Sequence, residues 1–243
     1  MSTPSPTNPE PGATGTDGTP AASAIYVLVD RSGSMGPMVD DVVGGFNNLL
    51  DELVRDGSTA TMTLVQFDSG DPQDVVADAV PVAEMVPLDR DTYVPRGGTP
   101  LLDATGALIN RAAARVRQRA ADGLPAEEVL FISITDGQEN QSTEFTLETI
   151  RSLVEAYTST GWQFVFMGAG LDVYQEAQAM GYAAASVQAF MADGAGTRQA
   201  WGSLSSKTLD RERKLRRRER LDARDFFEGD KPAEDDRRRR GGA

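Results

Sequence analysis

The stretch AIYVLVDRSGSM at residues 24–35 decides the fold class. Six apolar or aromatic residues run without interruption up to Asp30, which is typical of a strand buried on both faces of a parallel sheet. The loop that follows is small and polar and contains Ser32 and Ser34. Because open α/β sheets bind ligands beyond the carboxyl ends of their strands, this stretch predicts both a parallel sheet and a binding site at its edge.

Outward from this strand, apolar runs alternate with segments of helical periodicity. Strands are predicted at residues 60–67, 74–82, 128–135, 162–170 and 183–188, and helices at residues 38–55, 99–121, 146–157 and 171–181. Pro81 cannot donate to a ladder, which indicates that 74–82 is an edge strand. Since alternation implies right-handed crossovers, we predict the α/β class: a doubly wound, mostly parallel six-stranded sheet with helices on both faces.

The chain divides into three predicted parts. Residues 1–22 are rich in Pro, Thr and Gly and are predicted to be disordered, because they cannot bury enough apolar area to fold. Residues 23–206 form the predicted domain. Residues 207–243 are predicted to be a charged extension, in which a helix from Gly194 continues to about Arg224 and a disordered polar tail follows.

Composition restricts the chemistry that the chain can perform. The 243 residues include no cysteine and no histidine. Their absence excludes disulfides, a thiolate nucleophile, a Ser-His-Asp triad and any metal site built on thiolates or imidazoles. A metal would have to be held by oxygen, and oxygen ligands suit Mg²⁺, with Mn²⁺ and Ca²⁺ as alternatives.

Charge and hydropathy indicate the partners and the compartment. Residues 1–206 carry 10 basic and 27 acidic residues, whereas residues 207–243 carry 14 basic and 10 acidic residues. The acidic body does not suit nucleic acid, and only the tail could attract phosphate. The N-terminus lacks the basic and apolar regions of a secretory signal, and no apolar run approaches the roughly 20 residues that cross a bilayer. We therefore expect a cytoplasmic protein without a membrane segment.

Two carboxylates and three hydroxyls belong to loops at the predicted sheet edge: Asp30, Ser32, Ser34, Thr99 and Asp136. Each also fits a structural role. Asp136 with Gly137 is a common turn, Thr99 before Pro100 is a common helix cap, and the serines could satisfy loop amides. Capping, however, does not require Asp-x-Ser-x-Ser after one strand and Thr-Asp-Gly after another, so together these residues predict a site for a hard cation.

The segments DRSGSM (30–35), RGGTPL (96–101) and ITDGQEN (134–140) resemble the metal-ion-dependent adhesion site of von Willebrand factor A (VWA) domains. The resemblance covers about residues 23–206, and all five metal-site positions are present without substitution. Stretches such as TYVPRGGTPLLDA are similar to compact bacterial and phage-encoded intracellular members of that family.

The resemblance implies a role for each site residue. Ser32 and Ser34 would bind the metal directly, Thr99 directly or through water, and Asp30 and Asp136 largely through water. Two carboxylates roughly neutralise a divalent ion, and neutral hydroxyl ligands leave it electrophilic enough to accept an Asp or Glu from a partner protein. The implied function is a non-enzymatic protein-binding module. The resemblance also implies that bacterial members act in multiprotein assemblies, some of them beside AAA+ ATPases.

A metal-dependent phosphatase or hydrolase is an alternative that uses the same ion as a Lewis acid. The sequence offers no obvious nucleophile for it. Ser32 stands where an aspartyl-phosphate enzyme of the haloacid-dehalogenase kind has a second Asp, and no G-x-x-x-x-G-K-[ST] phosphate loop occurs.

Nucleic-acid contact through the basic tail is the other alternative. Residues 207–224 contain nine basic and four acidic residues. A solvated helix with pairs such as Glu212–Arg216 explains the same pattern and is the interpretation we favour. The pair Phe226–Phe227 is interpreted as an exposed contact motif, and Trp162 and Trp201 are predicted to pack in the core.

Overall fold

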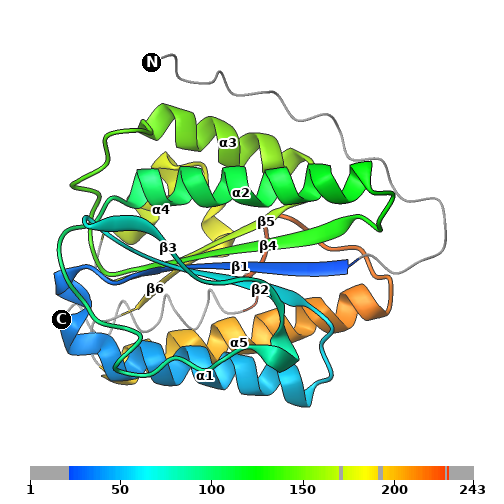
Figure 1. The fold of residues 1–243 in the computed structure, drawn as a ribbon, viewed down its shortest axis with the longest axis horizontal. Coiled ribbons are helices and arrows are strands. Elements are labelled where there is room, and N and C mark those ends of the chain that lie inside the picture. Colours follow the sequence, from blue (N-terminus) through cyan, green and yellow to red (C-terminus); the bar gives the residue numbers. More distant parts are fainter. Residues whose placement is uncertain (1–21, 170–171, 191–193, 228, 230–243) are drawn as a thin grey trace.

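A six-stranded sheet forms the centre of the molecule (Figure 1). The computed structural model describes residues 22–169, 172–190, 194–227 and 229. The strands lie in the order β3-β2-β1-β4-β5-β6, and β3 runs antiparallel to β2 while all other neighbours are parallel. The predicted α/β class and the mostly parallel six-stranded sheet are confirmed, and so is the prediction of an edge strand around Pro81.

The strands are β1 (Ala22–Asp30), β2 (Thr61–Asp68), β3 (Asp71–Pro81), β4 (Glu127–Thr135), β5 (Gln163–Ala169) and β6 (Val187–Phe190). The helices are α1 (Val39–Arg55), α2 (Leu101–Ala121), α3 (Leu147–Ser159), α4 (Val173–Ala179) and α5 (Gly194–Arg216), with 3₁₀ helices η1 (Gly33–Met38), η2 (Val82–Glu84) and η3 (Ala184–Ser186). No helix in the described ranges is both long and apolar enough to cross a membrane. The segments 1–21 and 230–243, predicted to be disordered, lie outside the described residues.

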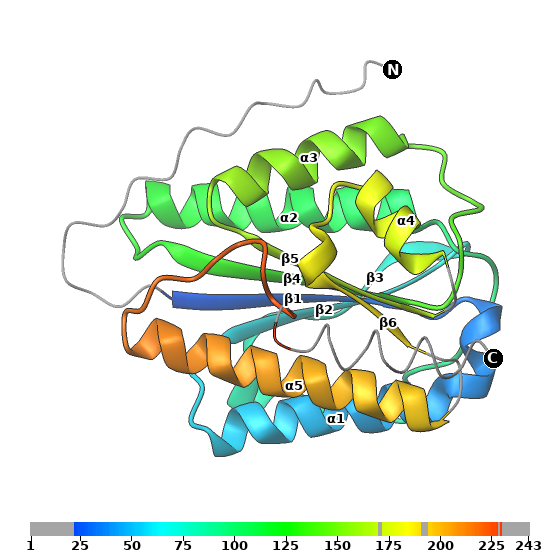
Figure 2. The same ribbon diagram turned by 180° about the vertical axis from the view of Figure 1, so that it is seen from behind.

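Helices cover both faces of the sheet, as predicted. Figure 1 shows α2, α3 and α4 above the sheet and α1 and α5 below it, and Figure 2 shows the same layers from behind. Alternate side chains of β1 enter opposite cores: Ile25, Val27 and Val29 pack with α1 and α5, whereas Tyr26 and Leu28 pack with α2 and α3. This burial on both faces explains the uninterrupted apolar run of β1.

Close packing of α1 against α5 depends on one glycine. A Cβ atom at Gly45 would lie 2.2 Å from Cγ of Trp201, well inside contact distance. Trp201 is buried in this interface, and Trp162 is buried on the other face of the sheet, so both tryptophans pack in the core as predicted.

The C-terminal region differs from its prediction in three ways. Helix α5 ends at Arg216, and the chain from Arg217 to Phe227 continues without further α-helix, so the predicted end near Arg224 was wrong. Glu212 does not pair with Arg216; it is buried and pairs with Arg211. Phe226 and Phe227 are buried in the core beside α5, which overturns their interpretation as an exposed motif. The predicted domain boundary between residues 206 and 207 falls inside α5.

Candidate metal centre

The three predicted site segments meet at the carboxyl ends of the central strands β1 and β4. These strands are neighbours, and β2 lies on the other side of β1, so the winding direction of the chain reverses between β1 and β4. This is the switch point at which open α/β sheets bind ligands. The segment 96–99 joins them from the loop that leads into α2.

Hydrogen bonds link the site residues of the β1 and β4 loops. Ser32 Oγ and Ser34 Oγ lie 3.0 Å apart, and Ser34 Oγ donates to Asp136 Oδ1 at 2.8 Å. Asp30 accepts from the backbone N–H of Ser32 at 2.6 Å and from Thr135 Oγ1 at 2.6 Å. The two loops therefore hold both carboxylates beside the two serine hydroxyls.

Thr99 completes the cluster, as the surroundings of Gly137 show. A Cβ atom at Gly137 would lie 2.8 Å from Thr99 Oγ1 and 3.6 Å from both Asp30 Oδ2 and Ser34 Oγ. Oxygen atoms from two loops thus face one small space beside Gly137 of the third loop, and a methyl group would fill it. All five residues predicted from the sequence are brought together.

The helix-capping roles that competed for Ser32 and Thr99 are not fulfilled. Ser32 is the N-cap of η1 but its side chain makes no capping hydrogen bond, and the N-cap position of α2 is Pro100 rather than Thr99. The first turn of α2 is served from elsewhere, because the backbone N–H of Leu102 donates to Glu139 Oε2 at 2.8 Å. The hydroxyls of Ser32 and Thr99 therefore do not serve as helix caps, and that of Ser32 contacts Ser34 instead.

The electrostatics of the site favour a bound cation. Asp30 is fully buried, and its burial raises its pKa to about 6, against hydrogen bonds from Thr135 and Ser32 and with a further contribution from Asp136. Burial also raises the pKa of Asp136, opposed by its bond from Ser34. Within the described ranges, no Lys or Arg forms an ion pair with either carboxylate. A buried and a partly buried carboxylate without a counter-charge are costly, and a divalent ion would compensate both.

The donor set fits a hard ion held largely by neutral oxygen. Among the described residues, no group of three or more acidic side chains is arranged to hold a metal by itself. Any ion here would depend on the hydroxyls of Ser32, Ser34 and Thr99 as well as on the two carboxylates. Mg²⁺ accepts such a mixed oxygen shell and retains water in it.

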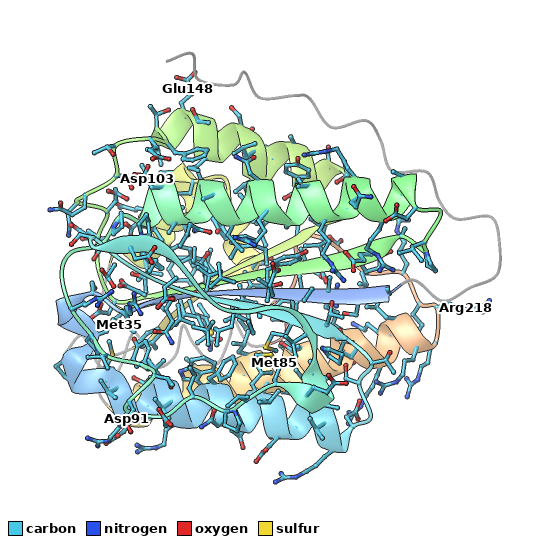
Figure 3. The ribbon with its side chains drawn as sticks, in the orientation of Figure 1. Met35, Met85, Asp91, Asp103, Glu148 and Arg218 are labelled. Carbon is cyan, nitrogen blue, oxygen red and sulfur yellow. The ribbon has the colours of Figure 1, made fainter. Side chains whose placement is uncertain are left out.

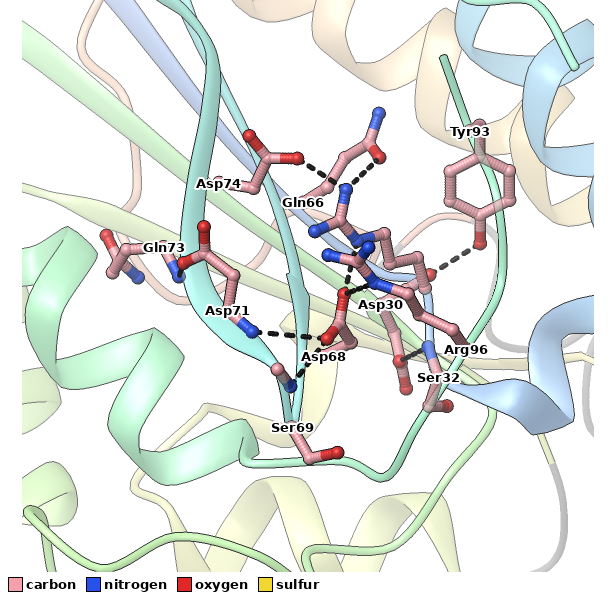
Figure 4. Close-up of polar contacts among 12 residues, drawn as sticks. Asp30, Ser32, Gln66, Asp68, Ser69, Asp71, Gln73, Asp74, Tyr93 and Arg96 are labelled. Atoms are coloured by element: carbon pink, nitrogen blue, oxygen red, sulfur yellow. Dashed lines mark hydrogen bonds and ion pairs between the residues drawn. The ribbon is translucent and has the colours of Figure 1, made fainter. Parts of the chain in front are cut away.

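Arg31 lies between Asp30 and Ser32 in the sequence, but its positive charge does not neutralise the carboxylates of the site. Its side chain forms ion pairs with Asp68 and Asp74 and donates a hydrogen bond to Gln66, three residues that Figure 4 labels. Arg96 Nε also donates a hydrogen bond to Asp68 Oδ2 at 3.0 Å. Because the Arg31 charge is satisfied at the end of β2, the carboxylate of Asp30 keeps its own charge uncompensated.

Backbone hydrogen bonds fix the loop that carries Thr99 between its neighbours. The N–H of Arg96 donates to the carbonyl of Arg31 at 2.7 Å, and the N–H of Gly33 donates to the carbonyl of Gly97 at 3.0 Å. Gly97 has φ +67°, and a Cβ atom there would lie 2.5 Å from Ser69 Oγ. Only glycine suits this position, because a side chain would be strained at this φ and would collide with Ser69.

Three supporting side chains were not predicted from the sequence. Asn140 Oδ1 accepts from the N–H of Thr99 at 3.0 Å, and the N–H of Asn140 donates to the carbonyl of Thr99 at 3.2 Å. Glu139 caps α2, and Asp103 accepts three backbone N–H groups of residues 143–145. They tie the Asp136 loop to the start of α2. The unsatisfied N–H groups at the start of α2 were the pattern that could have pointed to Glu139.

Solved structures share this arrangement of strands and helices. A von Willebrand factor type A protein from Catenulispora acidiphila superposes with a TM-score of 0.52 at 16% identity, covering 78% of this chain and 43% of that chain. The pilus adhesin SpaC from Lactobacillus rhamnosus GG, in an open conformation, gives 0.58 at 12% identity, with 79% and 30% covered. The chain has the VWA fold.

The VWA domain of SpRpn10 gives a TM-score of 0.50 at 10% identity, and the match covers 76% of this chain and 95% of that domain. At these identities the likeness shows the fold alone. This chain spans less than half the length of the Catenulispora acidiphila protein and of SpaC. No protein-family model and no curated protein sequence matches the chain.

Proposed function

We propose that this VWA fold binds Mg²⁺ at the Asp30–Asp136 cluster and uses the ion to bind an acidic side chain of a partner protein. Ser32, Ser34 and Thr99 would hold the ion, while Asp30 and Asp136 would orient its bound water. The observation that carries the proposal is the meeting of three loops at Gly137, where oxygens of Thr99, Asp30 and Ser34 face one small space. Ser34 also donates a hydrogen bond to Asp136 on the third loop.

A bound Mg²⁺ would supply one thing to this site, which is a positive charge open to one further oxygen ligand. The residues of the chain do the rest. Thr135 and the N–H of Ser32 fix both oxygens of Asp30, and Ser34 fixes Asp136. With both carboxylates held in place, the charge of the site is set before the partner arrives, which reduces the ordering that binding requires.

A protein-binding role explains the site better than hydrolysis. Asp30 is the carboxylate that could attack a phosphoester, yet it is fully buried and each of its oxygens accepts a hydrogen bond. A nucleophile needs an accessible oxygen with a free lone pair in line with the substrate. We therefore propose a non-enzymatic module.

The proposal includes the setting expected from the sequence. We place the protein in the cytoplasm of a bacterium, in an assembly with a protein that supplies the Asp or Glu, with an AAA+ ATPase complex as one candidate. One structural neighbour is named as a pilus adhesin, which is a binding role of that protein and agrees with a binding role here. Neither nucleic acid nor a membrane is part of the proposal.

The first test is the binding of Mg²⁺ to the purified chain by titration calorimetry. Wild-type protein is expected to bind the ion, and Ser32→Ala and Asp136→Asn are expected to bind it at least about tenfold more weakly, a loss of about 1.4 kcal/mol. Ser152→Ala is the matched control, because Ser152 is exposed on α3 and bonds only its own helix. Equal Mg²⁺ binding by all four proteins would overturn the site.

The second test asks for the partner. The chain is used as bait in a cell lysate with Mg²⁺ or with EDTA, in wild-type form and as Asp30→Ala and Ser32→Ala. A genuine partner is expected only with the wild-type protein in Mg²⁺. A protein retained equally under every condition would contradict metal-dependent binding.

A further inference from the structure

Asp68, the last residue of β2, joins two of the loops that form the metal centre. It is fully buried. Its Oδ2 atom accepts a hydrogen bond from Arg31 Nε at 2.5 Å and another from Arg96 Nε at 3.0 Å, and Figure 4 labels Asp68 and Arg96. Arg31 belongs to the loop that follows β1, and Arg96 belongs to the loop that carries Thr99. One carboxylate therefore holds a side chain of each loop.

The other oxygen of Asp68 fixes the direction of this carboxylate. Oδ1 accepts the backbone N–H groups of Gly70 at 2.6 Å and of Asp71 at 3.1 Å, in the turn between β2 and β3. The next residue, Ser69, forms two hydrogen bonds with Gly98: its N–H donates to the Gly98 carbonyl at 3.0 Å, and its Oγ accepts the Gly98 N–H at 2.9 Å. The end of β2 is therefore a fixed support for the loop that follows Arg96.

The charges around Asp68 balance. Arg31 also pairs with Asp74, whereas Asp68 is the one acidic group that forms an ion pair with Arg96 in the part of the chain that the structure describes. Burial by itself raises the pKa of Asp68, but hydrogen bonds from Arg31 and Arg96 lower it below its ordinary value, so the carboxylate is ionised at neutral pH. Two guanidinium groups thus face two carboxylates, and the four groups together carry no net charge.

These four groups lie close enough to the metal centre for their charge to affect it. Asp30 pairs in register with Phe67, so the Cα atoms of Asp30 and Asp68 lie about 6 Å apart across the two neighbouring strands. In 0.1 M salt, exposed charges interact over about 10 Å, and buried charges are screened less. An unpaired guanidinium group at this place would therefore oppose the binding of a divalent cation.

We propose that Asp68 is a positioning residue of the metal centre, which holds Arg31 and Arg96 in place and cancels their charge so that a divalent cation can bind. Asp68 is not one of the metal-site residues and acts on the site through the two arginines. This inference rests on the proposed function, because it concerns the affinity of the same site for Mg²⁺. It adds a residue that sets this affinity without contacting the ion.

The experiment measures Mg²⁺ binding to the full chain by titration calorimetry. Asp68→Asn keeps the size of the side chain and removes its charge. It should weaken Mg²⁺ binding by about ten- to a hundredfold, because it leaves a guanidinium group unpaired near a divalent ion. Asp56→Asn is the matched control, because Asp56 also pairs with two arginines, Arg213 and Arg216. This control should bind Mg²⁺ as tightly as the wild-type protein.

The control residue lies far from the metal centre. Asp56 follows α1, whose 17 residues extend over about 26 Å away from the metal-site loops. Figure 3 labels Met35, next to Ser34, at one end of the molecule and Arg218, just beyond α5, at the other end. A general effect of freeing two arginines would appear in both variants, whereas the proposed effect appears only in Asp68→Asn.

A second substitution separates the effect of charge from a loss of structure. Adding Arg96→Gln to Asp68→Asn removes the unpaired charge and should recover most of the lost Mg²⁺ affinity. A purely structural role of Asp68 predicts no recovery, because the substitution at residue 96 restores no contact. Arg96→Gln alone leaves Arg31 with two carboxylates and should strengthen Mg²⁺ binding by about threefold or more. Arg213→Gln is its control and should leave Mg²⁺ binding unchanged, because Arg213 pairs with Asp56.

The outcomes separate the two proposals. If the wild-type protein binds Mg²⁺ and Asp68→Asn binds it as tightly, or if the double variant binds it no more tightly than Asp68→Asn, the role of Asp68 is overturned and the metal centre stands. If Asp68→Asn does not fold, Arg96→Gln decides alone, and Mg²⁺ binding no stronger than that of wild type overturns the inference. A wild-type protein that binds no Mg²⁺ would overturn the proposed function and this inference together.

Discussion

Two polar clusters lie at opposite ends of the sheet, and each contains a fully or almost fully buried carboxylate, Glu212 in one and Asp30 in the other. At the amino ends of the strands, Glu212 accepts from Ser23 at 2.6 Å and from Ser58 at 3.1 Å, and Arg211 Nη1 lies 2.7 Å away. At the carboxyl ends, Asp30 and Asp136 also sit among hydroxyls but without a cation of the protein. The first cluster carries its own counter-charge, whereas the second leaves room for one.

A counter-charge from the protein itself distinguishes the structural cluster from the candidate binding site. Arg211 is buried and uses its remaining donors on Gln163 Oε1 at 2.6 Å and the carbonyl of Glu128 at 2.8 Å. Its hydrogen bonds close the cluster, so it fastens α5 to the starts of three strands. The carboxyl-end cluster is held as firmly in geometry but is open in charge, and an open charge is what a ligand can satisfy.

The largest expected effect breaks the closed cluster. Arg211→Ala should lower the free energy of unfolding by about 3–5 kcal/mol, because it leaves Glu212 buried and unpaired. The measurement is urea unfolding in Mg²⁺ and in EDTA, and the loss should be equal in both. Arg213→Ala is the control: Arg213 is half exposed and pairs with Asp56, and its removal should cost at most about 1 kcal/mol. A loss that depends on Mg²⁺ would mean that the two ends of the sheet are coupled.

The next effect is a pH dependence of the free energy of unfolding, which arises from the uncompensated carboxylate of Asp30. The pKa of Asp30 is raised to about 6 in the folded protein, above the value of 3.8 of a free side chain. The folded state therefore binds this proton more tightly, so the contribution of Asp30 to stability is present at low pH and is lost as pH rises through about 6. The loss amounts to about 3 kcal/mol at most, from about 1.4 kcal/mol per pKa unit.

The pH effect is measured in EDTA as the free energy of unfolding at pH 5 and pH 7. Other carboxylates titrate over the same range, so the comparison is between wild type and Asp30→Asn. Between pH 5 and pH 7, wild type should lose the free energy of unfolding that comes from Asp30, and Asp30→Asn should not. The free energy of unfolding of the variant minus that of wild type should therefore be larger at pH 7 than at pH 5. An identical pH dependence in the two proteins would show that Asp30 is not held as an uncompensated charge.

A bound Mg²⁺ should offset the stability that is lost through the ionised carboxylate of Asp30. At a Mg²⁺ concentration one hundred times its Kd, stability should rise by about 2.7 kcal/mol in wild type. Asp136→Asn and Ser34→Ala should lose most of this gain, while Arg213→Ala should keep it. The measurement is the melting temperature with and without Mg²⁺. If the site variants keep the full gain, the ion binds elsewhere.

The smallest expected effect fills the space beside Gly137. Gly137→Ala places a methyl group 2.8 Å from Thr99 Oγ1 and should weaken Mg²⁺ binding by about tenfold, or about 1.4 kcal/mol. Gly202→Ala is the control, because Gly202 lies in α5 with open space around it. It should leave Mg²⁺ binding unchanged and stabilise the helix by about 0.5–1 kcal/mol. Calorimetry that finds both variants equal to wild type would remove Gly137 from the site.

Much of the fold and all five candidate residues followed from the sequence because their patterns are local. The apolar run into Asp30 reports burial on both faces, and parallel strands bring their carboxyl ends to one edge whatever the details of packing. The structure places Ser32, Ser34, Thr99 and Asp136 around Asp30, while their role as metal ligands stays a prediction. The hydrogen bonds of Asn140 to Thr99 and of Glu139 to Leu102 could not be predicted in the same way. Each depends on which helix begins beside the Asp136 loop.

The alternation of strands and helices and the oxygen donors at the ends of the strands could be predicted from the amino acid sequence, because hydrophobic periodicity and the residues that follow a strand are properties of short segments. The tertiary structure was needed to show which buried charges have a counter-charge and which do not. Arg211 and Glu212 have the composition of a solvated helix, yet they are buried, because Ser23 lies 189 residues from Glu212 and still donates to it. Whether a buried charge is compensated depends on all the residues around it, and folding brings these residues together from distant parts of the sequence.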